Sequence, residues 1–234
     1  EFFNNVVNFF GGRFLRAGAR LHGCDKATKD AFAVMDMAGY NYGIARYKHD
    51  LKKYPNRIIV GSETFCADER EFYKMAKENP RIVGDFVWAG MDYLGEVGVG
   101  SWVPKDHCDG IMDGSCGWMT AGSGRVDFIG DETCEALYTK VALEKTPIEI
   151  GVVPHKYLKM KHSVSSWKMS MALHSWSFEG EEEKICRVEV YSIGETVQLF
   201  LNQKKIKQAK TKKNGRNIFK VIYQPGELKA VSLD

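Results

Sequence analysis

The sequence predicts an α/β part followed by an all-β part, and three observations support this. In the first 150 residues, apolar runs typical of strands alternate with helical patterns. Beyond residue 155 the hydrophobic period changes to two. The charge balance also shifts, because residues 1–150 carry 18 Lys/Arg against 22 Asp/Glu and residues 151–234 carry 15 against 8. We therefore expect a domain boundary near residue 150.

Composition narrows the classes of protein that fit. A chain of 234 residues, 44% of them hydrophobic, can build a core in one large domain or two ordinary ones. It has no run of eighteen apolar residues, so no membrane span is expected, and its acidic first part does not resemble a nucleic-acid surface. The six cysteines form no CxxC pair, which predicts buried free thiols, no metal site and, weakly, a reducing compartment.

The first elements are two helices around a short strand. Residues 26–35 and 45–54 have helical patterns, and Pro55 ends the second. Residues 37–42 between them read as a buried strand that ends in polar aromatic residues.

A strand, a helix and a second strand follow. The apolar runs at 57–60 and 82–87 are the strands, and residues 68–79 form the helix between them. Asp68 and Glu71 have the spacing of a capping box at its start. Its apolar stripe consists of Phe72, Met75 and Ala76.

The absence of a hairpin turn between these strands predicts that they are parallel. In folds of this kind, functional residues lie at the carboxyl ends of the strands. Glu63 and Trp88 occupy that position on the two strands.

The next segment is less regular. Residues 90–124 are rich in glycine and contain Trp102, His107 and Trp118, and a loop of that length is usually functional or disordered. Two tryptophans argue against disorder. Residues 131–143 read as a helix and residues 146–154 as an extended linker.

The last part alternates apolar and polar residues, which is typical of strands with one buried face. The inward positions are Val188, Val190, Val197, Leu199, Leu201, Phe219, Val221 and Tyr223. Turn signals separate them at Gly194, Asn202-Gln203, Asn214-Gly215 and Pro225-Gly226. This pattern predicts a β-sandwich, with Trp167 and Trp176 in its core or at an interface.

Several motifs in this order resemble glycoside hydrolase family 2, the β-galactosidase group. They are AGYNYGIARY, GSET and FVWAGMDYLGE, followed by SSWKMSMALHSWSFEG, VEVYSIGETVQLFLNQKK and FKVIYQPGELKAV. The likeness covers roughly residues 25–234. It implies that residues 1–150 form the C-terminal part of a (β/α)8 TIM barrel, its last three or so βα units, and that residues 151–234 form an immunoglobulin-like β-sandwich that is truncated.

The resemblance also implies retaining hydrolysis of a glycosidic bond without a cofactor. Glu63 would be the nucleophile, Tyr42 (or Tyr40) would donate a hydrogen bond to its carboxylate, and Trp88 would form the floor of the sugar subsite. This agrees with the chemistry, since retaining hydrolysis needs a carboxylate nucleophile and a second carboxyl about 5 Å away. A tyrosine donor keeps such a carboxylate ionised.

The chain departs from the family in its extent. A full barrel needs on the order of 250 residues, and the family's acid/base is the Glu of an Asn-Glu pair that does not occur upstream of Glu63. Because the chain also begins with Glu1 rather than Met, we expect a piece of a larger enzyme that is inactive alone, with its cellular location open.

Further residues have two open interpretations. Asn41, Asp92, Glu96 and Trp102 are candidate substrate contacts. Hydrogen bonds that fix the loop explain Asp92 and Glu96 equally well, the end of the strand at Asn41 can shift by one or two residues, and packing inside the long loop is favoured for Trp102. Residues 97–124 lack the Asn-x-Lys of the family's β-glucuronidases, which favours a neutral sugar, β-galactose first. The basic run at 204–213 reads as a solvated hairpin face, with binding of an acidic polysaccharide as the alternative.

Three hypotheses follow. The chain is part of a glycosidase, with a carbohydrate substrate, neither nucleic acid nor membrane as a partner, and homo-oligomerisation of the intact enzyme left open. Alternatively it is a non-catalytic carbohydrate-binding module, whose affinity would depend on tryptophans and survive Glu63→Gln. The third possibility is a structural domain that binds no sugar.

Overall fold

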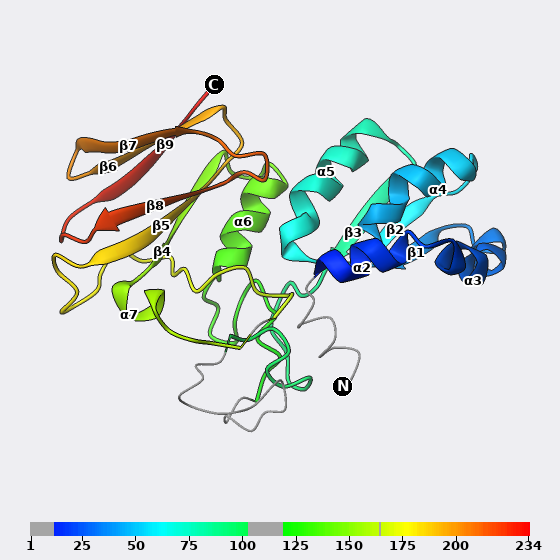
Figure 1. Ribbon diagram of the computed structural model, residues 1–234, viewed down its shortest axis with the longest axis horizontal. Helices are drawn as coiled ribbons and strands as arrows, with labels where there is room; N and C mark the ends of the chain where they lie inside the picture. Colours follow the sequence, from blue (N-terminus) through cyan, green and yellow to red (C-terminus); the bar gives the residue numbers. More distant parts are fainter. Residues whose placement is uncertain (1–11, 103–118, 164) are drawn as a thin grey trace.

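The computed structural model describes residues 12–102, 119–163 and 165–234. Figure 1 shows two parts side by side, a sheet with its helices on the right and two layers of strands on the left. No helix in the described ranges is both long and apolar enough to cross a bilayer. The same residues include no group of three or more His, Cys, Asp or Glu placed to hold a metal ion.

The first part is a parallel sheet with helices between its strands. Its elements are α2 (Gly12–Ala19), α3 (His22–Ala33), β1 (Ala38–Asn41), η1 (Ile44–Arg46), α4 (Tyr47–Lys53), β2 (Ile59–Thr64), η2 (Cys66–Asp68), α5 (Glu69–Glu78) and β3 (Ile82–Val87). Both strand pairs are parallel, in the order β1-β2-β3, which confirms the predicted strand–helix–strand arrangement. Closure into a barrel stays a prediction.

One face of this sheet is buried under helices. Ile59 of β2 is fully buried in a cluster with Tyr47 of α4 and with Phe72 and Met75 of α5. Because side chains alternate along a strand, the neighbouring positions face the other way, and Phe86 of β3 is 68% exposed there. The apolar stripe predicted for the helix at 69–78 is therefore confirmed.

The predicted capping box at the start of α5 is wrong. Asp68 has near-helical dihedral angles (φ −98°, ψ −14°) and its side chain caps no backbone N–H. Its carboxylate instead forms an ion pair with Arg16 of α2. A charge pair with a residue far away in the chain replaces the local hydrogen bond, and the short turn η2 leads into the helix.

The second part contains two antiparallel sheets. After α6 (Cys134–Ala142) its elements are β4 (Ile148–Val153), α7 (His155–Leu158), β5 (Ile185–Ser192), β6 (Thr196–Leu201), β7 (Lys204–Lys210), β8 (Arg216–Ile222) and β9 (Leu228–Leu233). The sheets have the strand orders β4-β5-β8 and β7-β6-β9. All eight predicted inward positions lie in or against their shared core. The alternating pattern is confirmed, while an immunoglobulin-like topology stays a prediction.

Residues 146–154 are not the predicted linker. Ile148–Val153 form strand β4, which pairs antiparallel with β5 from Ile148 opposite Ser192 to Val153 opposite Arg187. Ile148, Ile150 and Val152 contribute to the core between the sheets. The partner strand lies more than thirty residues away, so a local pattern showed the extended backbone and not the pairing.

The turn between β6 and β7 forms without the glycine that usually favours it. Asn202 and Gln203 both have positive φ angles, 47° and 67°. Two such residues in a two-residue hairpin are characteristic of a type I′ turn, in which Asn-Gly is the preferred pair. Gln203 therefore occupies a backbone conformation that suits glycine better.

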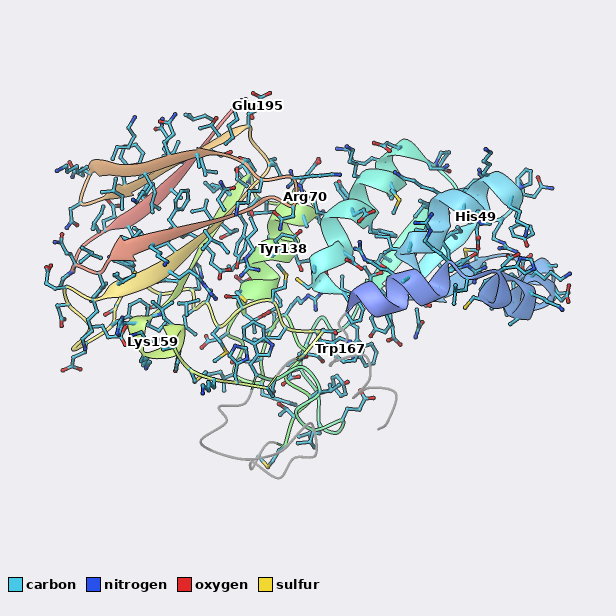
Figure 2. The ribbon with its side chains drawn as sticks, viewed as in Figure 1. His49, Arg70, Tyr138, Lys159, Trp167 and Glu195 are labelled. Atoms are coloured by element: carbon cyan, nitrogen blue, oxygen red, sulfur yellow. The ribbon has the colours of Figure 1, made fainter. Side chains whose placement is uncertain are left out.

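Helix α6 joins the two parts. Its buried Leu137, Tyr138 and Val141 pack with Cys66 of the first part and with Tyr191 of β5. Figure 2 shows Tyr138 on α6 and Arg70 on α5 where the parts meet, and both side chains donate to backbone carbonyls of the sandwich, at Asn214 and Ser192. The four described cysteines are free thiols; Cys66, Cys134 and Cys186 are buried as predicted, whereas Cys24 is partly exposed. Cys108 and Cys116 lie outside the described residues.

Candidate active site

The parallel strands bring the main candidate residues to one edge of the sheet. Asn41 is opposite Glu63 at the ends of β1 and β2, and the backbone N–H of Tyr42 donates to the Glu63 carbonyl over 2.7 Å. On the other side of β2, Thr64 is opposite Val87, the residue before Trp88. Residues from three separate motifs therefore meet at the carboxyl ends of adjacent strands.

The sequence left open whether Tyr40 or Tyr42 lies beside Glu63, and the structure distinguishes the two. Tyr40 points into the buried face and donates to Asp50 over 2.7 Å. Tyr42 lies beyond the strand end with a positive φ of 52°, which is uncommon for a residue other than glycine and is found most often at functional sites. Burial raises the pKa of Tyr42, and the hydrogen bond to Glu63 and the charge of Glu63 add to the rise.

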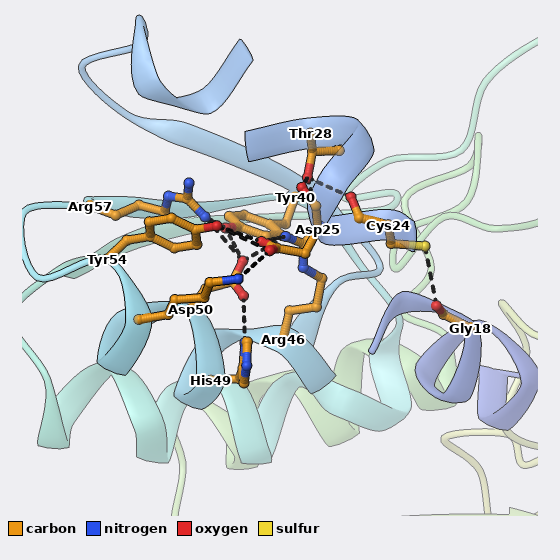
Figure 3. A network of polar contacts seen from close by, with 11 residues as sticks. Gly18, Cys24, Asp25, Thr28, Tyr40, Arg46, His49, Asp50, Tyr54 and Arg57 are labelled. Carbon is orange, nitrogen blue, oxygen red and sulfur yellow. Dashed lines mark hydrogen bonds and ion pairs between the residues drawn. The ribbon is translucent and has the colours of Figure 1, made fainter. Parts of the chain in front are cut away.

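A buried charge network holds the strand that carries Tyr42 (Figure 3). The Asp50 carboxylate, 1% exposed, accepts from Tyr40 and pairs with Arg46 over 2.8 Å and with Arg57 over 3.2 Å. Arg46 also reaches Asp25 on α3. Because each charge has an opposite partner, the network is satisfied and ties Tyr40, two residues before Tyr42, to the helices.

An aromatic cluster surrounds the strand ends. Tyr42 stacks on Phe65 with ring centroids 4.1 Å apart, and Trp88 meets Tyr93 edge-on at 5.5 Å. Phe65 and Trp167 are buried in this cluster, whereas Tyr42, Trp88 and Tyr93 are partly buried rings packed against it. Partly exposed rings beside a carboxylate offer the kind of flat apolar surface on which the C–H face of a sugar can lie.

Trp88 is fixed from behind by a buried arginine. Arg125 donates through Nη1 to the Trp88 carbonyl over 2.8 Å and through Nη2 to the carboxylate of Glu69. The backbone of Ala89 bonds to Ser123 and Arg125, and the Trp88–Ala89 peptide is cis. Burial raises the pKa of Glu69, although Arg125 opposes the rise. The first turn of α5 is thereby connected to the end of β3.

The remaining candidates have protein partners of their own. Asp92 accepts from the Gly122 backbone N–H over 2.8 Å, and Glu96 accepts from the Tyr93 hydroxyl. Asn41 accepts from Ser62 over 2.6 Å. Trp102 stacks on His162 with ring centroids 4.2 Å apart. Asn41, Asp92 and Glu96 thus lie around the strand ends, and the described contacts of Trp102 do not join it to the Trp88 cluster.

Three residues near the site, Asp85, Trp167 and Arg125, were not among the site residues predicted from the sequence. Asp85 of β3 lies on the helix side and accepts from Thr64 over 2.6 Å, and burial raises its pKa. Trp167 and Arg125 come from segments remote from the strand ends, so no local motif marked them as part of the site. His107 and Trp118, expected in the long loop, lie outside the described residues.

The chemistry available to these groups follows from their partners. The Glu63 backbone is hydrogen-bonded to Tyr42, whose ring stacks on Phe65 in the aromatic cluster. Two further carboxylates, Asp85 and Asp92, are both engaged in hydrogen bonds within the protein. A carboxylate that accepts one oriented O–H donor keeps further lone pairs free for a ligand.

Comparisons with known proteins found one matching family model and several similar solved structures. A family model described as a domain of unknown function, DUF4982, matches residues 183–234. No curated protein matches the chain. A solved glycosyl hydrolase family 2 member from Bacteroides cellulosilyticus is similar, with 30% identity and a TM-score of 0.75 over 89% of this chain and 27% of its own.

Two further structures extend the likeness. Another family 2 member, from Bacteroides cellulosilyticus DSM 14838, has 27% identity and a TM-score of 0.66 over 89% of this chain and 25% of its own. A β-glycosidase from Bacteroides vulgatus, with 17% identity and a TM-score of 0.52 over 85% of this chain and 29% of its own, shares the fold. The chain spans about a quarter of the length of the family 2 members it matches. We therefore identify it as a glycoside hydrolase family 2-like segment.

Proposed function

We propose that the chain is the nucleophile-bearing part of a retaining exo-glycosidase that hydrolyses terminal β-linked sugars. Glu63 attacks the anomeric carbon, Tyr42 orients the carboxylate, and Trp88 supports the sugar ring. The observation that supports this best is the meeting of Glu63 and Tyr42 at adjacent strand ends, in a chain that resembles family 2 proteins over 89% of its length.

The second carboxyl of the mechanism comes, in this proposal, from the longer protein. The retaining reaction needs an acid/base about 5 Å from the nucleophile. Asp85 and Asp92 are engaged within the protein, and the chain corresponds to about a quarter of the matched proteins. The segment alone should therefore not turn over glycosides.

The proposed substrate is a neutral sugar, with β-galactosides first. The charged side chains described at the strand ends are the carboxylates Glu63, Asp92 and Glu96. The guanidinium behind Trp88 belongs to Arg125, which is buried and paired with Glu69. It is therefore not free to bind a sugar carboxylate. An aryl β-galactoside should be cleaved faster than the matching β-glucuronide.

The test uses the full-length protein that carries this chain. A 2-fluoro β-galactosyl inactivator should attach covalently to the peptide containing Glu63, as mass spectrometry can show. Glu63→Gln should abolish labelling and turnover, while the exposed Glu78→Gln on α5 should leave both unchanged. Labelling of a different carboxylate would reject the nucleophile assignment.

The alternative of a non-catalytic module has its own signature in this experiment. The partly exposed rings of Trp88 and Tyr93 could hold a sugar without any reaction. Sugar binding that survives Glu63→Gln, disappears in Trp88→Ala and occurs without turnover would favour that alternative.

A further inference from the structure

Trp167 lies in the long connection between β4 and β5 of the sandwich, yet its side chain lies in the site. The indole is 6% exposed and meets the rings of Phe65 and Tyr42 edge-on, with centroids 5.5 and 6.0 Å apart. Its Nε1–H donates to the Tyr42 hydroxyl oxygen over 2.8 Å. Figure 2 shows Trp167 among the loops below α2, at the junction of the two parts.

This hydrogen bond restricts what the tyrosine can do. An indole N–H is a donor only, so it cannot accept the proton of the Tyr42 hydroxyl. A hydroxyl has one hydrogen, and with one lone pair occupied by Trp167 that hydrogen must point to another acceptor. Glu63 is the acceptor beside it: the Glu63 carbonyl accepts the Tyr42 backbone N–H over 2.7 Å, and the pKa of the Tyr42 hydroxyl is raised by burial and then by the neighbouring Glu63 carboxylate.

The indole is anchored on both sides along the chain. The Trp167 backbone N–H donates to Ser165 Oγ, which in turn donates to the Val99 carbonyl over 2.8 Å. On the other side, the Met169 N–H donates over 2.6 Å to Glu135, a buried carboxylate on α6. The backbone on both sides of the indole is therefore fixed, to the loop of Val99 and to α6.

We propose that Trp167 is a positioning residue, which directs the Tyr42 hydroxyl proton toward Glu63 and so fixes the orientation of the carboxylate. The inference rests on the proposed role of Glu63. It assigns a task in the reaction to the connection between β4 and β5, because the indole that donates to the Tyr42 hydroxyl comes from that connection.

The kinetic test compares Trp167→Phe with Trp176→Phe in the full-length protein. Trp176 is a matched control, because it packs against Phe178 and Tyr223 in the sandwich and its indole donates to the Gln224 carbonyl. Trp167→Phe should lower kcat about tenfold with little change in KM, which is the effect of one lost oriented hydrogen bond. It should also move the acid limb of the pH–rate profile to higher pH, whereas Trp176→Phe should change neither quantity.

A double variant separates positioning from general damage to the fold. If Trp167 acts through Tyr42, then Trp167→Phe should cost nothing more once Tyr42→Phe is present. An equal loss in both backgrounds, or an unchanged acid limb in the single variant, would overturn the proposal. Thermal unfolding of each variant shows whether the fold itself is affected.

A spectroscopic measurement tests the same connection without turnover. In protein labelled with 15N-tryptophan, the Trp167 indole N–H resonance should shift in Glu63→Gln, but not in Glu78→Gln and not when Tyr42→Phe is already present. An unchanged chemical shift of the Trp167 indole N–H in Glu63→Gln would refute the positioning role. A protein that shows the shift but neither turnover nor labelling would instead refute the proposed function.

Discussion

Two buried carboxylates show how the surroundings of a residue set its charge. Asp25 on α3 bonds to Lys53, which is the main reason why its pKa is lowered, with Tyr54 and Arg46 adding to the effect. Glu69 on α5 is fully buried, and burial raises its pKa although Arg125 and Thr139 are its partners. The first carboxyl therefore favours folding when ionised, and the second is costly to leave without its counterion.

Asp25→Asn should remove an acid-dependent component of stability. A carboxyl whose pKa is lower in the folded state stabilises fully above its unfolded pKa, about 3.9, and loses this contribution as the pH falls toward the folded pKa. The variant should lose about 1–3 kcal/mol at pH 6 and show a flatter stability profile below pH 5. Urea unfolding between pH 2 and 6 measures the stability loss at pH 6 and the dependence of stability on pH. The exposed Asp30→Asn is the control. Parallel profiles for Asp25→Asn and the wild type would contradict this.

Arg125→Met tests the buried ion pair behind Trp88. The change leaves the Glu69 charge buried without a counterion, which typically costs about 3–5 kcal/mol. Lys140→Met breaks the partly exposed pair with Glu132 and should cost no more than about 1 kcal/mol. The difference between the stability losses of the two variants should become smaller at low pH, because Glu69 then takes up a proton. Denaturant unfolding at pH 5 and 8 compares them, and equal losses would mean that burial of the pair contributes little.

At the scale of elements, local sequence signals and tertiary contacts together determine the local geometry, and the two can disagree. Asp68 has the type and spacing of a helix cap, yet the ion pair with Arg16 takes its carboxylate and a short turn begins α5. In the β6–β7 hairpin the pairing of the strands imposes a positive φ on Gln203. In the first case a distant ion pair determines the local geometry, and in the second the pairing of two adjacent strands does so.

Gln203→Gly should stabilise the hairpin. A residue with a Cβ in the left-handed region costs about 1–2 kcal/mol, which glycine avoids. The exposed Gln208 lies within β7, so Gln208→Gly should instead destabilise by roughly 0.5–1 kcal/mol, because glycine gains freedom in the unfolded chain. Thermal unfolding of the two variants should show shifts of opposite sign. Destabilisation by Gln203→Gly would mean that the turn has a different backbone conformation.

At the scale of the whole molecule, α6 connects the parallel sheet and the sandwich. Its Leu137 is fully buried in the cluster that includes Cys66 from one part and Tyr191 from the other. Hydrogen bonds from Arg70 and Tyr138 to sandwich carbonyls cross the same junction. A contact of this kind couples the stabilities of the two parts, and it also holds the segment of Trp167 against the strand ends.

Leu137→Ala should therefore destabilise both parts together. Truncating a fully buried leucine costs about 2–5 kcal/mol. Hydrogen exchange should show a matching loss of protection at Ile59 in β2 and at Val197 in β6. Leu21→Ala, at a largely exposed position, should change stability by less than about 0.5 kcal/mol. Loss of protection in only one of the two strands would show that the parts unfold independently.

The sequence by itself determined the features that depend on local periodicity. It located β2, β3 and the stripe of α5, the alternating strands of the sandwich with their turns, and the position of Glu63 and Trp88 at strand ends. Such patterns are readable because a strand or helix must bury one face, and the residues of that face recur at a fixed spacing.

Only the tertiary structure decided which distant groups meet. The expected linker is strand β4, because it pairs with β5. Asp68 forms an ion pair with Arg16, and Tyr40 lies on the helix side whereas Tyr42 lies beside Glu63. The tertiary structure also brought Trp167 to Tyr42 and Arg125 to Trp88. A local window of sequence records how a residue prefers to be buried, whereas hydrogen bonds and ion pairs are fixed by whichever groups the folded chain places within reach.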